Sequence, residues 1–302
     1  MEQREKIIKD LHEVIDKSIE EFMKNIPAVQ KSILEEVLLL SKELDIKRGN
    51  ITNSINNWKL LSQINAKIER IILTPKYAEQ LKDLKKTFSK IQLLQQQYFT
   101  IIASDFTLPK VFKIFKKDAI DSTIKQLTET GISKKVSEGI ENLLRTQIRS
   151  GGKYFDLVDH FKNYLEGTKD TGGVMESHAR TIVTDSLNTF SRSMHQTISS
   201  DFGFRWYIFT GSLKETSREA CKVMVEDKYF HESQFKDIIK GNINGRKVAI
   251  DKKTKMPLGF KDNTTAENYE QLCNGWNCGH ALYAVSDSVV PPAVRAKVKL
   301  TS

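Results

Sequence analysis

The chain has 302 residues, and its 47 lysines and arginines outnumber its 38 aspartates and glutamates, which gives a formal net charge of +9. With 39% hydrophobic residues it can build a sizeable core, so a disordered chain is excluded. Its three cysteines, Cys221, Cys273 and Cys278, exclude a disulfide-based fold and favour a reducing compartment. The sequence shows neither a secretory signal nor the roughly 18 consecutive apolar residues of a membrane helix, so we expect a soluble protein without a membrane partner.

The first 167 residues predict a series of long amphipathic helices. Glycine is almost absent from the first hundred residues, and apolar side chains recur there at helical spacing. Between Tyr77 and Tyr98 the apolar positions keep a heptad phase that is broken only by Gln95, which is compatible with a coiled coil. Ordinary bundle core explains these stripes better than a dedicated partner-binding face. We predict a helical region over residues 1–167, arranged either as a bundle or as an extended arm.

Helical segments continue beyond the first hundred residues. Two of them are expected to be separated near Gly131, and residues 168–173 form a turn-rich linker. The next predicted helix runs from about Val174 to Ser199 and carries small and apolar residues inward. Its polar residues are expected around the edges: Arg180, Arg192 and His195.

Aromatic and β-branched residues become frequent after residue 202 and predict short strands. The expected elements are a strand at 204–210, a polar helix at about 215–224, a brief strand at 229–230, a small hairpin at 247–256 and a closing strand at 281–285. The predicted class is therefore α+β. A long, mostly helical N-terminal region at 1–167 precedes a small α+β module at 174–290 and a basic tail at 291–302.

The C-terminal module contains five residues whose side chains suit a zinc ion: Cys221, His231, Cys273, Cys278 and His280. Thiolate sulfur and imidazole nitrogen are the ligands that zinc prefers, in tetrahedral groups of four. The candidate zinc ligands are Cys221, His231, Cys278 and His280. Because the spacing lacks the two close ligand pairs of common structural zinc sites, the alternative of buried free thiols beside hydrogen-bonded histidines remains open.

Catalysis finds little support in the sequence. Cys278 and His280 stand two residues apart just before the closing strand, and we expect their side chains to point away from each other, so we expect no proton transfer between them. There is no phosphate-binding loop and no pattern that names an acid and a base. We therefore assign no catalytic residue and expect a protein that is not an enzyme. The alternative is a zinc-dependent hydrolase or nuclease, or an effector, that uses the C-terminal Cys/His set.

Two clusters of lysines are candidates for contact with nucleic acid. The first has Phe112 and Phe115 interleaved among its lysines, and the second lies on the predicted basic turn. The lysines are Lys110, Lys113, Lys116 and Lys117 in the first cluster and Lys252, Lys253 and Lys255 in the second. Such patches attract phosphate backbones without reading sequence. The competing interpretation is a solvated helix face.

Several elements of the last third, read in order, resemble the phage minor head protein family typified by the F protein of phage Mu, also called head morphogenesis proteins. The similar elements are a helix at 178–188, a Trp-containing strand at 206–211, a Thr-Arg-x-x-Cys turn at 216–221, a short strand at 228–230 and a closing Asn-Cys-x-His box at 277–280. The family helix has its arginine after the isoleucine, whereas Arg180 precedes Ile182 here. Gly279 replaces the arginine of the box. The motif residues are Arg180, Trp206, Arg218, Cys221, Asn277, Cys278 and His280.

The resemblance implies a minor structural protein of a tailed-phage head, associated with the portal or the inner capsid. Head assembly, DNA packaging or genome delivery is its implied role. Implied partners are the portal protein, the major capsid protein and packaged double-stranded DNA, bound without sequence preference. The implied location is the virion, and the host cytoplasm during assembly. No cofactor is implied, although the Cys/His set keeps zinc open. For Arg218 and Asn277 we favour a role in knitting the module together over contact with a substrate.

Overall fold

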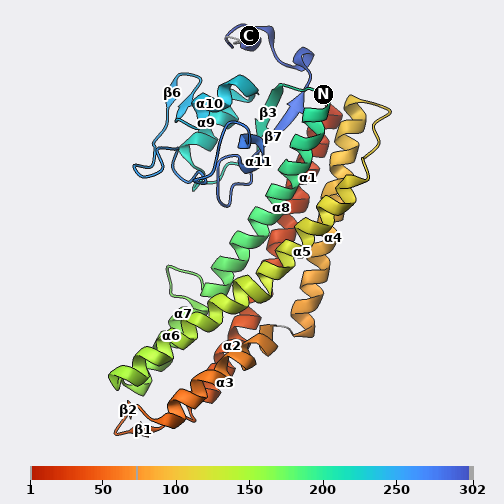
Figure 1. Ribbon diagram of the computed structural model, residues 1–302. Coiled ribbons are helices and arrows are strands. Elements are labelled where there is room, and N and C mark those ends of the chain that lie inside the picture. Colours follow the sequence, from red (N-terminus) through yellow and green to blue (C-terminus); the bar gives the residue numbers. More distant parts are fainter. Residues whose placement is uncertain (1, 73, 299–302) are drawn as a thin grey trace. The chain divides into compact units, whose positions relative to one another are not determined.

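The structure is a computed structural model that describes residues 2–72 and 74–298, and it confirms the α+β class (Figure 1). Its residues are 63% helical, and the small sheet lies in the C-terminal part of the sequence. The first eight helices are α1 (Glu2–Met23), α2 (Ile26–Ser41), α3 (Ile55–Ile72), α4 (Pro75–Ile102), α5 (Val111–Leu127), α6 (Lys134–Ser150), α7 (Tyr154–Glu166) and α8 (Val174–Asp201). A two-stranded hairpin of β1 (Ile46–Lys47) and β2 (Asn50–Ile51) precedes α3.

The later elements are shorter. They are β3 (Trp206–Thr210), α9 (Glu219–Asp227), β4 (Tyr229–His231), α10 (Phe235–Ile238), β5 (Asn242–Ile243), β6 (Arg246–Lys247), α11 (Tyr269–Leu272), β7 (Ala281–Val285) and α12 (Pro292–Arg295). A π-helical turn (Glu129–Ser133) joins α5 to α6, and 3₁₀ turns occupy Glu232–Gln234 and Asp287–Val289. Of the predicted basic tail, residues 299–302 lie outside the described residues.

Local signals in the sequence placed several element boundaries correctly. The closing strand is β7, with the bounds expected for it. At the end of α6, Gly151 adopts a left-handed conformation with φ of 64°, and its N–H bonds to the carbonyl of Gln147. The polar helix expected from about residue 215 begins instead at Glu219, because Arg218 before it has an extended backbone. Among the described residues, no helix combines the length and the apolar character needed to cross a bilayer.

The contacts divide the chain into two compact units, and neither unit is continuous in sequence. Unit 1 contains residues 1–15, 88–116 and 184–302, and unit 2 contains residues 16–87 and 117–183. This grouping cuts across the boundary expected between residues 167 and 174. The amphipathic pattern of a helix shows which face is buried but not which neighbour buries it, so it carries no signal of such a division.

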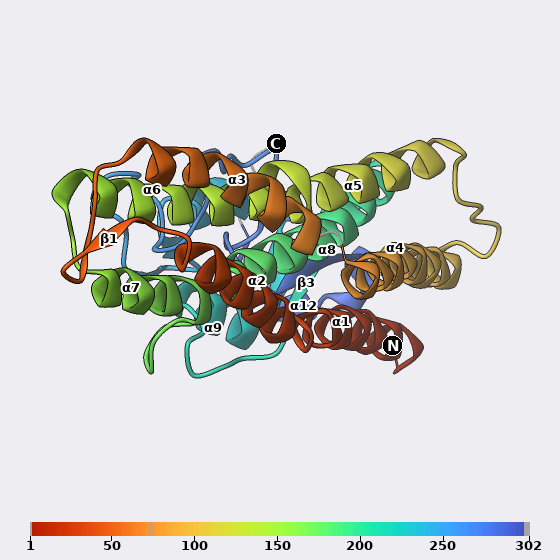
Figure 2. The same ribbon diagram turned by 90° about the horizontal axis from the view of Figure 1, so that it is seen from below.

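Unit 2 is a helical bundle. Its helices α2 and α6 each pack against both α3 and α7 (Figure 1 and Figure 2). Tyr77 Oη donates a 2.9 Å hydrogen bond to the carbonyl of Leu127, and the N–H of Glu176 donates to Gln30 Oε1 at 2.8 Å. The helical stripes supply its fully buried residues: Ile26, Ile33, Val37, Ile68, Ile140, Ile148, Leu157, Phe161 and Leu165. Of the two arrangements expected for the N-terminal helices, a bundle or an extended arm, this unit therefore forms a bundle.

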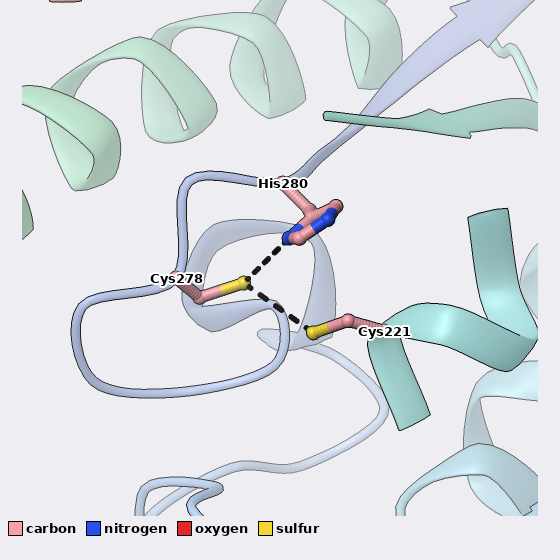
Figure 3. Close-up of side chains that lie close together, drawn as sticks. All are labelled: Cys221, Cys278 and His280. Carbon is pink, nitrogen blue, oxygen red and sulfur yellow. Dashed lines mark hydrogen bonds between the residues drawn. The ribbon is translucent and has the colours of Figure 1, made fainter. Parts of the chain in front are cut away.

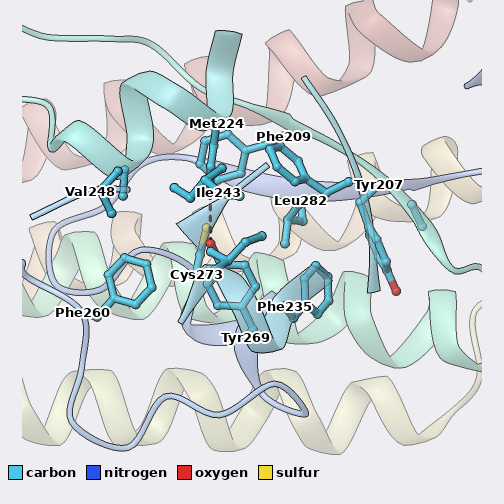
Figure 4. Close-up of a cluster of buried hydrophobic side chains, with 14 residues drawn as sticks. Tyr207, Phe209, Met224, Phe235, Ile243, Val248, Phe260, Tyr269, Cys273 and Leu282 are labelled. Atoms are coloured by element: carbon cyan, nitrogen blue, oxygen red, sulfur yellow. Dashed lines mark hydrogen bonds between the residues drawn. The ribbon is translucent and has the colours of Figure 1, made fainter. Parts of the chain in front are cut away.

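Unit 1 contains an antiparallel sheet in the order β4-β3-β7. Strand β3 reads as a continuous apolar run because both of its faces are covered. One face carries Tyr207 and Phe209, which pack in a cluster with Met224 of α9 and with Tyr269 (Figure 4). The other face carries Trp206, Ile208, Val285 and Val290. Alternate residues of β3 thus enter two different cores.

The outer edge of β7 is capped by side chains. Ala284 donates its N–H to His195 Nε2 at 2.8 Å, and its carbonyl accepts a 2.7 Å hydrogen bond from Tyr98 Oη. His195 Nδ1 lies 2.9 Å from Gln95 Oε1. Gln95, the polar break in the heptad phase, is fully buried in this role. A sheet edge needs such partners when it is buried, because its backbone groups would otherwise stay unsatisfied.

The expectation that Arg192 and His195 lie around the edges of their helix is wrong. Arg192 is 5% exposed and His195 is 2% exposed. Both side chains form hydrogen bonds to backbone groups nearby: His195 accepts from an N–H of β7, and Arg192 donates to a carbonyl of the loop before β7. Polar side chains are buried where they form hydrogen bonds to backbone groups that have no other partner. The periodicity of apolar residues along a helix does not show where such backbone groups lie.

Candidate metal centre

Three of the predicted zinc ligands meet in unit 1: Cys221, Cys278 and His280, called here the Cys/His cluster (Figure 3). Cys221 Sγ lies 3.9 Å from Cys278 Sγ, and Cys278 Sγ lies 3.6 Å from His280 Nδ1. The ligand atoms of all three residues are within 4.8 Å of one another. Each side chain is buried. The cluster therefore has the composition and the compactness of a metal site.

Contrary to the sequence-based expectation, Cys278 and His280 do not point away from each other. Their side chains are in contact at 3.6 Å. The expectation was wrong even for a strand, because only neighbouring side chains alternate between faces and residues two apart share one face. Residues 278–280 have no regular structure, and β7 begins only at Ala281. The irregular backbone turns both side chains to the same side.

His231, the fourth predicted ligand, is not brought to the cluster. It pairs with Trp206 across the β3–β4 ladder, and the two rings lie 5.0 Å apart. Its Nδ1 contacts Ser233 Oγ at 2.9 Å. Trp206 enters one core of the sheet and Phe209, which stacks on His280, enters the other. The alternation of side chains along β3 therefore puts His231 on the opposite face from the cluster.

The Thr-Arg-x-x-Cys turn contacts the closing box and the segment directly before it. Arg218 stands directly before α9 and donates from Nη1 to the carbonyl of Asn274 at 3.0 Å and from Nη2 to the carbonyl of Trp276. Cys221 lies in the first turn of α9 and reaches Cys278. Residues three apart at a helix start lie on one side, so both can engage the same loop. This contact supports the predicted knitting role of Arg218.

Helix α8 holds the same loop from another side. Arg192 donates from Nη2 to the carbonyls of Cys278 and His280, the latter at 2.6 Å, and Nη1 lies 3.5 Å from the carbonyl of Leu272. Asp185 accepts the backbone N–H of Asn277 at 2.8 Å. Arg192 therefore fixes the backbone of two cluster residues.

Sequence reasoning missed Arg192 as a functional residue. A signal was present, because the polar residues of α8 recur at helical spacing and are buried: Asn188, Ser191, Arg192, His195 and Ser199. Arg180, the motif arginine on the same helix, is exposed and belongs to unit 2.

The pKa values of the three thiols at the site are shifted in different directions. Hydrogen bonds from the thiols of Cys221 and Cys273 hold the pKa of Cys278 well below its usual range. Donating to Cys278 raises the pKa of Cys221, and burial raises that of Cys273. Cys221 Sγ also accepts a 3.3 Å hydrogen bond from Asn274 Nδ2. The site thus stabilises a thiolate, which is the form of cysteine that binds metals.

Gly259 provides a test of how Arg218 is seated. Its φ is +84°, and a Cβ at this position would lie 2.0 Å from Arg218 Nε. We expect Gly259→Ala to destabilise the protein by about 2–4 kcal/mol, because the left-handed backbone and the clash add. Gly203→Ala is the matched control, since Gly203 has φ of +70° and nothing within 4 Å of its added Cβ. Urea unfolding of both variants separates the two costs, and equal losses would contradict a clash at Arg218.

The predicted lysine clusters are largely exposed, but their aromatic neighbours are not. Phe112 is buried, and Phe115 stacks on Phe190 with ring centroids 5.4 Å apart. The two phenylalanines that are interleaved with the lysines in the sequence therefore pack into the core of the unit instead of lying beside the lysines on the surface. Lys110, Lys113, Lys117, Lys252, Lys253 and Lys255 are exposed, and Lys116 is half-buried with Nζ 3.2 Å from Ser89 Oγ.

Comparison with known proteins finds no match for this chain: no family model, no curated protein and no solved structure is similar to it.

Proposed function

We propose that this chain is a minor structural protein of a tailed-phage head, associated with the portal or the inner capsid and acting in head assembly, DNA packaging or genome delivery. One observation carries the proposal. The Thr-Arg-x-x-Cys turn and the segment that ends in the closing box lie more than fifty residues apart and meet in space: Arg218 binds the carbonyls of Asn274 and Trp276 just before the box, and Cys221 contacts Cys278 within it. Motif elements that depend on one another in space support a resemblance better than separate matches do.

The contacts of the motif residues are those of a structural module. Arg218 binds backbone carbonyls, and the backbone of Asn277 binds Asp185. An enzyme built on the Cys/His cluster would need an open coordination position for water and substrate. Cys278 is 4% exposed and His280 is 5% exposed. This burial favours the structural role over the zinc-dependent hydrolase, nuclease or effector.

The charge of the chain supports a place beside packaged DNA. The exposed lysines before and within α5 and on the turn at 252–255 add to the net charge of +9. Lysines on a solvated surface bind phosphate groups without reading bases. Because Phe112 and Phe115 are packed inward, base stacking is not part of this proposal.

The proposal is tested in the strain that encodes the chain. After induction, DNA-filled particles are purified on a density gradient and analysed by mass spectrometry. We expect the chain among the virion proteins, and we expect deletion of its gene to lower the yield of infectious particles. A plasmid copy of the wild-type gene, which should restore the yield, is the control. Particles that lack the chain, or a deletion with normal yield, would contradict the proposal.

A further inference from the structure

We propose that Cys221, Cys273, Cys278 and His280 bind a structural zinc ion. The inference goes beyond the proposed function and does not depend on it, because it rests on the geometry of the Cys/His cluster and on the burial of Cys273 beside it in the sequence. Three of them come from the end of α11 and the loop that leads into β7, and Cys221 comes from α9. The ion would tie these segments together.

The distances within the Cys/His cluster match those around a tetrahedral zinc ion. With Zn–S bonds of about 2.3 Å and Zn–N bonds of about 2.0 Å, two sulfurs lie about 3.8 Å apart, and a sulfur and a nitrogen lie about 3.5 Å apart. Cys221 Sγ and Cys278 Sγ are separated by 3.9 Å, and Cys278 Sγ and His280 Nδ1 by 3.6 Å. These two separations therefore suit ligands of one tetrahedral ion.

Cys273 is the fourth ligand that the structure offers. It is fully buried, it stands directly after α11, and it precedes Cys278 by five residues on the same loop. The other nearby imidazole, that of His12, is already engaged. Its ring bonds to the backbone of Gly279, and its Nε2 lies 3.5 Å from Tyr283 Oη. Cys273 Sγ lies outside the group of ligand atoms within 4.8 Å of one another, so binding of the ion would require its side chain to turn toward the cluster.

Charge balance also favours three thiolates. Zinc with three thiolates and a neutral imidazole carries one net negative charge. The buried guanidinium of Arg192 supplies one positive charge and bonds to the carbonyls of Cys278 and His280. With two thiolates, the site would be neutral and the charge of Arg192 would lack a partner there. Buried charges require such compensation.

Two further observations point to an occupant. His280 is 5% exposed, its ring stacks on Phe209, and its Nε2 has no hydrogen-bond partner within the described residues. A buried imidazole without a strong polar partner is costly, and a bond from Nδ1 to zinc would offset that cost. In addition, Asn274 donates to Cys221 Sγ, and Tyr269 Oη holds the Asn274 amide at 2.6 Å. Oriented N–H donors to sulfur are typical of the groups that surround metal-bound thiolates.

The first experiment uses the full-length wild-type chain and requires no variant. The protein is expressed with added zinc and purified under reducing conditions, and its zinc content is measured by mass spectrometry. We expect one zinc ion per chain and a lower melting temperature after chelation. Replacing zinc with Co²⁺ should produce the visible absorption bands of a tetrahedral site and strong thiolate-to-cobalt charge transfer. A folded chain that contains no zinc and gives no such spectrum would overturn the proposal.

Variants then identify the ligands. Cys273→Ser should reduce the thiolate-to-cobalt absorption per bound ion by about one third, because the number of thiolates falls from three to two. His231→Gln is the matched control, since it removes a buried histidine of the same sheet on the other face, and it should leave metal content and spectrum unchanged. Wild-type absorption in Cys273→Ser would refute the three-thiolate site. A Cys221–Cys278 disulfide in freshly isolated protein, found by thiol counting, would do the same.

Discussion

Replacing Arg192 with methionine should destabilise the folded protein by about 3–5 kcal/mol, because buried hydrogen bonds to a charged group contribute about 1.5–3 kcal/mol each. Methionine keeps much of the side-chain volume but removes every donor. The carbonyls of Cys278 and His280 would lose their partner. Unfolding in urea at neutral pH measures the loss.

Two companion variants make this result specific. Arg180→Met changes an exposed arginine on the same helix and should alter stability by less than about 0.5 kcal/mol. Arg192→Lys keeps the charge but lacks the forked guanidinium, so it should recover only part of the loss. Similar unfolding midpoints for Arg192→Met and Arg180→Met would show that Arg192 does not secure the loop.

Acid should destabilise the protein through His195. Burial lowers the pKa of His195 to about 3. The N–H of Ala284 can only donate, so Nε2 must accept and the neutral ring carries its proton on Nδ1, facing Gln95 Oε1. In the unfolded chain the imidazole has a pKa of about 6.5. As pH falls from about 6.5 toward 3, the imidazole of His195 becomes protonated in the unfolded state but stays neutral in the folded state. The free energy of unfolding therefore falls by about 1.4 kcal/mol per pH unit.

His195→Gln isolates this contribution. The variant should be less stable than the wild type at neutral pH, because the cap of Ala284 is disturbed. Between pH 6 and 4, however, the stability of the variant should fall less steeply than that of the wild type, and the two slopes should differ by about 1.4 kcal/mol per pH unit. His160→Gln, which replaces an exposed histidine, is the control and should keep the wild-type slope. Urea unfolding across this pH range provides the measurement, and parallel slopes for His195→Gln and the wild type would refute the prediction.

Much of the secondary structure is predictable because its signals are local. The stripe from Val174 onward predicts α8, and the apolar residues at 281–285 predict β7. The grouping of the helices into two units is not predictable in this way. Packing partners depend on contacts between residues far apart in the sequence, and a periodic pattern contains no information about them.

The candidate site is predictable in part. Residue chemistry selects Cys221, Cys278 and His280, which the structure brings together. It also selects His231, whose position on the other face of the sheet depends on the register of β3 and β4. The role of Arg192 was missed because an arginine on a mostly helical, charged chain resembles a surface residue. Its burial becomes evident only when the loop that it binds is in place.

The capping of β7 has a consequence for how the module meets other molecules. Both backbone hydrogen-bonding groups of Ala284 are occupied from within unit 1, by His195 and Tyr98. A strand from a neighbouring molecule would therefore find no donor or acceptor at that residue. Natural sheets often discourage such pairing with a proline or a charge on the outermost strand, whereas β7 consists entirely of buried apolar residues. Pairing of a strand from a second copy with β7 is therefore blocked at Ala284 by side chains of the same unit.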